Sequence, residues 1–229
     1  MLLERRLRLI RGVRVVQRAD GPFELQIVPM RRLTPEEVQR LVDRLPPTTG
    51  PVVTSALSPI EQGPFRDLGF VDFEALHLLR HSFTPPPNRS SPARIRPARR
   101  GDLKRILDID AQCFDEFWAL DRAGIEAARK ATPSHHYVVA ELDHQVVGYA
   151  ITGHAGAPSF LQRLAVDPAV QGMGIGSHLV TEGIEWAMAR RALHMMVNTQ
   201  VSNEGAASLY QSLGFVLDAD QLKVLELPR

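Results

Sequence analysis

The stretch from Leu164 to Ser177 contains residues whose types and spacing could bind an anion. A strand-like run and a turn at Asp167-Pro168 precede the alternating glycines of Gln171-Gly172-Met173-Gly174-Ile175-Gly176-Ser177. The start of a helix leaves about four backbone N–H groups without partners and is the positive end of the helix dipole. Glycines let a ligand approach this backbone closely, so the stretch could hold a pyrophosphate. Glycines also serve tight turns and close packing, so the stretch alone leaves both interpretations open.

A second chemical candidate is Tyr210, in a segment from Val201 to Phe215 that we expect to form a helix over about 204–213. A tyrosine hydroxyl has a pKa near 10, so at neutral pH it is protonated and can serve as a proton donor. The alternative is a helix tyrosine that packs its ring in the core.

The elements that would position these residues follow from hydrophobic periodicity and turn residues. We expect strands at 93–98, 137–142, 145–151, 160–166 and 194–199, and near 215 and 222–227. Asp143-His144 separates two of them as a hairpin turn, and Asp102 is expected to cap a helix running to about Cys113. Further helices are expected over about 123–131 and 174–190. Strands mixed with helices in this order predict an α/β or α+β sheet with helices packed on it.

Length and composition set limits on the function. The 229 residues suggest about one and a half domains, 44% are hydrophobic and 23% charged, and the net charge is +1. This balance excludes global disorder and argues against nucleic-acid or membrane binding by charge. The single cysteine excludes an intrachain disulfide and a multi-cysteine zinc site, and we expect no metal. With no long apolar run and no signal-like start, we expect a cytoplasmic protein.

A proline- and serine-rich stretch divides the chain. We expect a first domain over 1–83, a linker over 84–93 and a second domain over 94–229, because Pro85-Pro86-Pro87 favours an extended spacer. A long loop within one domain is the alternative, although such loops are uncommon.

From about Ala93 to the C-terminus the chain resembles the GCN5-related N-acetyltransferases (GNAT family). Gln171-Gly172-Met173-Gly174-Ile175-Gly176 matches their Arg/Gln-x-x-Gly-x-Gly/Ala signature, and Asn203 to Phe215 matches their Asn-x-x-Ala-x-x-x-Tyr-x-x-x-Gly-Phe segment. The chain looks most like the ribosomal-protein N-terminal-amine acetyltransferases, also through Cys113-Phe114 and Trp118. The resemblance implies a GNAT-like, mixed and mostly antiparallel sheet flanked by helices.

The resemblance also implies acetyl-CoA as co-substrate, with no metal. In the family, the strand before the loop hydrogen-bonds the pantetheine arm, a role that falls here on Leu164, Ala165 and Val166. The pyrophosphate would rest on backbone N–H groups of the loop, and Asn203 would contact the cofactor. The loop residues are Gln171, Gly172, Met173, Gly174, Ile175, Gly176 and Ser177. No Lys or Arg lies among them, so backbone donors would do most of the binding.

The implied reaction is direct attack of an amine on the thioester, with Tyr210 as the general acid. The position at which the N-terminal-amine enzymes carry a glutamate base is Asn198 here, and an amide cannot accept the proton. Three alternatives remain open: a water chain, a loop carboxylate, or a substrate that arrives as the free amine. The water chain would involve Asn198, Thr199 or Gln162, and the carboxylate would be Asp115 or Glu116. His135, His136 and His154 are weaker candidates.

The acceptor is a primary amine of unspecified type: a protein N-terminus, a lysine or a small-molecule amine. Phe114, Phe117, Trp118 and Gln162 are the candidate residues of its cleft, although aromatic residues at such spacing are more often core. We expect a monomer or homodimer.

The first domain contains a faint repeat of the second. Residues 53–71 align without gaps to residues 198–216, with identities at Thr54, Leu68, Gly69, Phe70 and Val71, and with Phe65 facing Tyr210. Where the repeat should carry glycines, the chain reads Pro29-Met30-Arg31-Arg32-Leu33. We therefore expect a degenerate GNAT-like α+β unit with a structural role. A small interaction domain is the alternative.

The sequence thus predicts an acetyl-CoA-dependent N-acyltransferase whose second domain is active. A non-catalytic CoA-binding sensor, motivated by Asn198, and an assembly subunit that binds no nucleotide are the competing interpretations.

Overall fold

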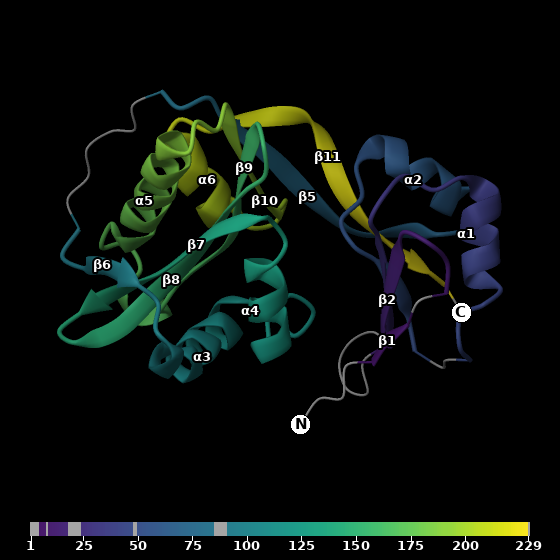
Figure 1. The fold of residues 1–229 in the computed structure, drawn as a ribbon, viewed down its shortest axis with the longest axis horizontal. Helices are drawn as coiled ribbons and strands as arrows, with labels where there is room; N and C mark the ends of the chain where they lie inside the picture. The colour runs from purple at the N-terminus through teal and green to yellow at the C-terminus, as the bar shows by residue number, and fades with distance from the viewer. Residues whose placement is uncertain (1–4, 8, 18–23, 48–49, 85–90, 229) are drawn as a thin grey trace. The chain divides into compact units, whose positions relative to one another are not determined.

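A computed structural model describes residues 5–7, 9–17, 24–47, 50–84 and 91–228. Their contacts divide the chain into two compact units (Figure 1). The first unit comprises the chain up to Leu78 together with 198–202 and 218–229, and the second comprises 79–197 and 203–217. Neither unit is continuous in sequence, so the boundaries 1–83 and 94–229 stay a prediction. The proline-rich part of the expected linker, 85–90, lies outside the described residues.

The second unit is built on a mixed sheet with the neighbour order β10-β9-β8-β7-β6. These strands are β6 (Arg94–Pro97), β7 (Ser134–Leu142), β8 (Gln145–His154), β9 (Pro158–Val166) and β10 (His194–Gln200). Pairing is antiparallel from β6 to β9 and parallel between β9 and β10. The predicted Asp143-His144 turn joins β7 to β8, and both residues have positive φ. The predicted mixed, mostly antiparallel sheet flanked by helices is therefore confirmed.

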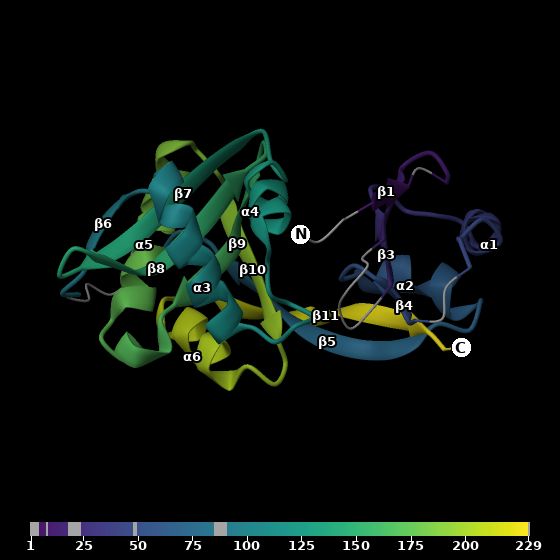
Figure 2. The ribbon, with the colours of Figure 1, turned by 90° about the horizontal axis from the view of Figure 1, so that it is seen from below.

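Helices cover both faces of this sheet (Figures 1 and 2). On one face, α5 (Ile175–Ala189) and α6 (Glu204–Ser212) pack on a core that includes Val138, Ala150 and Leu161. On the other face, α3 (Leu103–Cys113) and α4 (Arg122–Arg129) pack on a core that includes Val139, Tyr149 and Ile151. Neighbouring strand residues thus serve opposite cores, as the alternation of side chains along a strand requires.

Two short 3-10 helices belong to the second unit, and a long strand is divided between the two units. The 3-10 helix η1 (Arg100–Asp102) precedes α3, so Asp102 closes that turn and pairs with Arg96 instead of capping α3 through its side chain. The second, η2 (Pro168–Val170), follows β9. A single strand, β11 (Val216–Leu227), replaces the two expected at the C-terminus, and it contributes residues to both units.

The first unit has its own core and its own strand–helix alternation. The elements in chain order are β1 (Arg5–Leu7), β2 (Val13–Gln17), β3 (Leu25–Pro29), α1 (Pro35–Val42), β4 (Val52–Thr54), α2 (Pro59–Arg66) and β5 (Val71–His81), which belongs to the second unit from Leu79 on. Strands β3 and β4 pair in parallel, as β9 and β10 do. Val15, Ile27, Leu41 and Phe65 are among the buried core residues.

The internal repeat has a structural counterpart. In each unit a strand leads through a short helix to a glycine with positive φ, Gly69 at 86° and Gly214 at 92°. The next residue closes the helix in the same way: the Phe70 N–H donates to the Phe65 carbonyl at 3.2 Å, and the Phe215 N–H to the Tyr210 carbonyl at 3.1 Å. The predicted strand, short helix and strand are thus present in both places.

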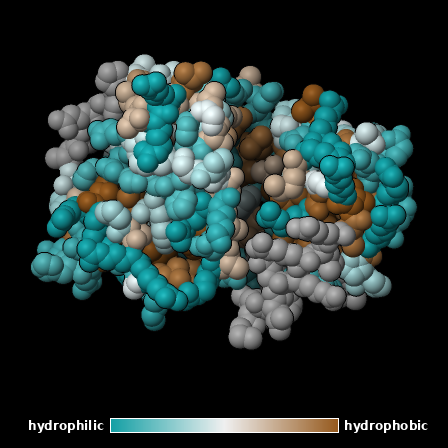
Figure 3. Space-filling model, viewed as in Figure 1, coloured by the Kyte–Doolittle hydropathy of each residue, from teal (hydrophilic) through white to brown (hydrophobic). Residues whose placement is uncertain are grey.

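Three further observations concern membrane spans, metal sites and the molecular surface. No helix in the described part of the chain is long and apolar enough to cross a membrane. Over the same residues, no group of three or more His, Cys, Asp or Glu side chains is placed to hold a metal ion. The face drawn in Figure 3 is mostly hydrophilic, with separate hydrophobic patches.

Candidate active site

A cavity of about 430 Å³ lies within the second unit, where the end of β9 meets the starts of α5 and α6. It brings together most of the residues predicted to bind the cofactor, the predicted general acid and one aromatic residue of the predicted cleft. The lining includes Leu164, Ala165, Val166, Gln171, Gly172, Gly174, Ile175, Gly176, Ser177, Asn203, Tyr210 and Phe114. Met173 is not among the lining residues and is 44% exposed.

The strand that borders the cavity has one open edge. Leu164, Ala165 and Val166 pair with β8, whereas the pairing of β9 with β10 covers only Pro158 to Phe160. The two strands therefore separate beyond Phe160. Of the carbonyls in this stretch, that of Val166 accepts hydrogen bonds from Gln171 Nε2 at 3.0 Å and Cys113 Sγ at 3.2 Å. An open strand edge of this kind can hydrogen-bond an extended ligand as an added strand.

The connection from β9 to α5 presents a row of backbone donors. Gly172 and Gly174 have φ values of 80° and 78°, a left-handed conformation that favours glycine. No described residue accepts a hydrogen bond from the N–H groups from Gly172 to Ser177, and the first helical bond runs from His178 N–H to the Gly174 carbonyl at 3.0 Å. Gly174 is the N-cap and has no side chain to satisfy these donors. The result is a donor-rich helix start suited to an anion.

The nearest carboxylate in sequence, Asp167, is already satisfied. It accepts a hydrogen bond from the Ala169 N–H and forms an ion pair with Arg105. The Ala169 hydrogen bond, followed by Arg105, holds the pKa of Asp167 below its ordinary value. Asp167 therefore stays ionised and fixes the turn after β9, while Arg105 compensates its charge.

On α6, Asn203 and Tyr210 face the same cavity. Asn203 caps the helix, since its Oδ1 accepts the Ala206 N–H at 3.0 Å. Tyr210 is only 5% exposed, and its ring lies 5.7 Å from that of Phe215. Burial raises the pKa of the Tyr210 hydroxyl well above its ordinary value. The phenol therefore remains protonated throughout the neutral range and able to donate.

Several predicted residues lie away from this lining. Asn198 is exposed on β10 and belongs by its contacts to the first unit. Phe117 and Trp118 pack edge to face at 5.0 Å, and Gln162 has a buried Oε1 without a partner among the described residues. The residues that line the cavity include no carboxylate and no imidazole.

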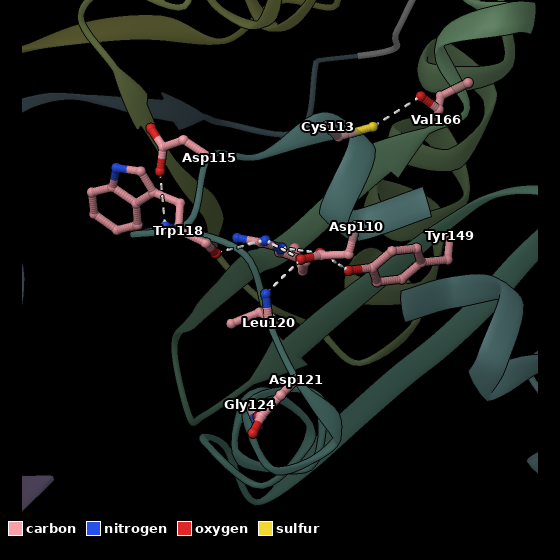
Figure 4. A network of polar contacts seen from close by, with 10 residues as sticks. Asp110, Cys113, Asp115, Trp118, Leu120, Asp121, Gly124, Tyr149 and Val166 are labelled. Carbon is pink, nitrogen blue, oxygen red and sulfur yellow. Dashed lines mark hydrogen bonds and ion pairs between the residues drawn. The ribbon is translucent and has the colours of Figure 1, made fainter. Parts of the chain in front are cut away.

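A buried polar network that was not predicted from the sequence lies next to the cavity (Figure 4). Asp110 on α3 is fully buried and forms a bidentate ion pair with Arg163 on β9, with both contacts at 2.7 Å. It also accepts hydrogen bonds from the Tyr149 hydroxyl and the Leu120 N–H. The available signal was helical spacing: Asp110 lies four residues after Ile106 and three before Cys113, so a charged residue shares the apolar face of α3.

Known proteins share sequence with this part of the chain. Residues 103–215 match the acetyltransferase (GNAT) family. The chain is 33% identical over 132 residues to the N-alpha-acetyltransferase RimI of Mycobacterium tuberculosis, covering 55% of this chain and 80% of that protein. It is 28% identical over 182 residues to a mycothiol acetyltransferase of Acidothermus cellulolyticus, covering 69% of this chain and 56% of that protein.

A solved structure extends the likeness in fold to the whole chain. A GCN5-related N-acetyltransferase from Kribbella flavida superposes with a TM-score of 0.68 and 13% identity, covering 99% of this chain and 90% of that one. The chain therefore belongs to the acetyltransferase (GNAT) family and is an N-acetyltransferase, close to the ribosomal-protein N-terminal-amine acetyltransferases.

Proposed function

We propose that this enzyme transfers the acetyl group of acetyl-CoA to the α-amine of a protein N-terminus. The observation that carries the proposal is that three features line one cavity: the open edge of β9, the glycine loop without a capping side chain, and the protonated Tyr210. These three parts match the three chemical parts of the co-substrate: an amide-bearing arm, a pyrophosphate and a thioester.

The residues present fit this co-substrate. The backbone of Leu164 to Val166 would hold the pantetheine arm, because its second edge is open. The N–H groups from Gly172 to Ser177 would hold the pyrophosphate, because they have no other acceptor among the described residues. Asn203 lines the same cavity and would contact the cofactor from α6. Bound acetyl-CoA supplies the electrophilic carbonyl carbon of its thioester.

Tyr210 would act as the general acid. As the amine nitrogen bonds to the carbonyl carbon, the carbon–sulfur bond breaks and the sulfur takes up negative charge. A phenol that burial keeps protonated can return a proton to this sulfur. The proton lost by the amine leaves to solvent, since no residue lining the cavity is a carboxylate or an imidazole.

This absence favours an α-amine over a lysine. At pH 7.5 about a third of α-amines with a pKa near 7.8 are neutral, compared with about one lysine in a thousand. An acceptor that loses its own proton needs no base at position 198, where this chain has Asn198. The relative named as an N-alpha-acetyltransferase supports the same acceptor class, whereas the mycothiol acetyltransferase leaves a small-molecule amine as the competing outcome.

A peptide panel tests the acceptor. The enzyme and acetyl-CoA are incubated with a peptide carrying a free N-terminus and one internal lysine, and products are located by fragmentation mass spectrometry. We expect acetylation of the α-amine and none of the lysine. The same peptide with a formylated N-terminus is the matched control. Acetylation of the lysine in that control, or turnover of small amines only, would contradict the proposal.

We further propose that the first unit is a degenerate half of the same fold with a structural role. The shared order of elements, the parallel pairs β3/β4 and β9/β10, and the matching helix ends at Gly69 and Gly214 support it. Phe65 occupies the place of the tyrosine, so this unit lacks the acid. The domain boundaries 1–83 and 94–229 belong to the same proposal.

A further inference from the structure

The segment that joins α3 to α4, residues 114–121, is held by one buried ion pair. Arg163 donates from Nε and Nη2 to the two carboxylate oxygens of Asp110, and Nη2 also donates to the Trp118 carbonyl at 2.9 Å. The guanidinium carbon lies 3.4 Å from the centre of the Phe114 ring. The Arg163 side chain thus contacts the segment at Phe114 and at Trp118, which are four residues apart.

Asp110 holds the same segment at its far end. Its Oδ1 accepts the Leu120 N–H at 2.6 Å, and the Tyr149 hydroxyl donates to its Oδ2 (Figure 4). Between these anchors, the Asp115 carboxylate accepts the Trp118 N–H at 3.0 Å and its carbonyl accepts the Ala119 N–H at 2.8 Å. The segment is therefore a fixed turn built around a carboxylate with no exposure to solvent.

The ion pair is an expensive way to stabilise a fold. Removing two charges from water costs several kcal/mol per ion, and apolar replacements of buried pairs are often neutral or stabilising. What the pair provides is a fixed position for both side chains, because a bidentate guanidinium–carboxylate contact sets the distance and the angle between them. Its location is informative as well: Arg163 directly precedes Leu164, which lines the cavity, and Phe114 lines the cavity itself.

We infer that the Asp110–Arg163 pair positions the 114–121 segment as the wall against which the acceptor amine binds, and so sets acceptor affinity. This inference rests on the proposed function. Arg163 is a positioning residue, because it acts through Phe114 and the turn that follows. Asp115 and Glu116 on this turn are exposed and do not line the cavity, and their negative charge suits an N-terminus that approaches as a cation before it loses its proton.

Arg163→Lys is the principal test. Lysine keeps the charge but loses the planar fork and the contact with the Phe114 ring. We expect the KM for the peptide acceptor to rise by about tenfold, because small misplacements of a binding wall have large effects. The KM for acetyl-CoA and kcat should stay within about twofold. Phe114→Leu, which keeps the ion pair, should raise the acceptor KM in the same direction and covers the case in which Arg163→Lys does not fold.

Arg96→Lys is the matched control. Arg96 is 13% exposed and bridges Asp102 and Glu141 in the same unit, without contact to the 114–121 segment. It should leave the acceptor KM unchanged. An equal rise in both lysine variants would overturn the inference, since the effect would then be general loosening of the unit. An unchanged acceptor KM in folded Arg163→Lys would overturn it as well.

A second readout does not depend on turnover. In a Trp186→Phe background, Trp118 is the only tryptophan. Arg163→Lys should increase acrylamide quenching of Trp118, whereas Arg96→Lys should not. If the parent acetylates no peptide but the quenching changes as expected, the proposed acceptor is wrong while the positioning role stands. If quenching does not change, the positioning role is wrong.

Discussion

Two strand-to-helix connections, β9 to α5 in the second unit and β3 to α1 in the first, share their arrangement of elements but differ in their chemistry. Each follows a strand whose parallel partner comes next in the chain. In the second unit Gly174 starts the helix, and neither a capping side chain nor an acidic residue occupies the first turn. In the first unit Thr34 and Glu37 form a reciprocal capping box, with Pro35 in the first turn and Glu36 beside it.

The difference lies in whether the N–H groups at the helix start have acceptors. In the first unit the Glu37 N–H donates to Thr34 Oγ1 at 3.3 Å, the Thr34 N–H donates to Glu37 Oε2 at 3.1 Å, and proline has no N–H. Arg31 Nη2 lies 2.6 Å from Glu37 Oε1 in the same capping box. This hydrogen bond lowers the pKa of Glu37 to about 2. The first unit satisfies its helix start internally, whereas the corresponding N–H groups of the second unit have no acceptor among the described residues.

The largest expected effect comes from giving the second unit a negative charge at its helix start. Gly174→Glu places a carboxylate where the pyrophosphate would rest and forces a non-glycine residue into φ of 78°. Juxtaposed like charges cost several kcal/mol, so acetyl-CoA affinity should fall by about 100-fold or more in a calorimetric titration.

Gly69→Glu is the control matched for charge and backbone strain. Gly69 has φ of 86°, and a Cβ there would meet nothing within 4 Å. This variant should lower stability while leaving acetyl-CoA affinity unchanged. Equal loss of affinity in both variants would mean that strain, not the loop donors, explains the effect.

The next effect concerns a second difference between the units: the second unit has Tyr210 where the first has Phe65. Tyr210→Phe should reduce kcat by about 100-fold, the scale of a lost general acid, with the acetyl-CoA Kd unchanged. Phe65→Tyr added to this variant should restore nothing. Steady-state kinetics with parallel titrations separate the two quantities. A Tyr210→Phe enzyme with parental kcat would remove Tyr210 from the mechanism.

The smallest effect tests the role assigned to the first unit. Thr34→Ala removes a capping oxygen and should cost about 1 kcal/mol of stability, measured by urea unfolding. Thr34→Ser keeps the oxygen and should cost less. Acetyl-CoA affinity should be the same in both. An affinity that falls only in Thr34→Ala would assign a ligand-binding role to the α1 helix start.

Local signals in the sequence predicted much of the fold and most of the residues that line the cavity. The backbone conformation of the Asp143-His144 turn and of the glycines between Gln171 and Ser177 depends on a few neighbouring residues. The residue types in these short stretches therefore predict it. The predicted strand and loop residues, except Met173, line one cavity because they are close together in the chain.

The acceptor side could not be predicted in the same way. Asp110 and Arg163 are far apart in sequence, and no local pattern predicts that a carboxylate on α3 pairs with an arginine on β9. Asp102 was expected to cap α3, but Arg96 and the Arg99 N–H compete for its carboxylate and place it in a 3-10 turn. Such pairings depend on how helices pack on the sheet.

The most direct test of the central claim is to count acetyl-CoA molecules bound per chain by native mass spectrometry, with Gly174→Glu and Gly69→Glu alongside the parent. We expect one molecule per chain in the parent and in Gly69→Glu, and none in Gly174→Glu at the same concentration. No binding by the parent, or undiminished binding by Gly174→Glu, would contradict the assignment of the glycine loop in the second unit as the acetyl-CoA site.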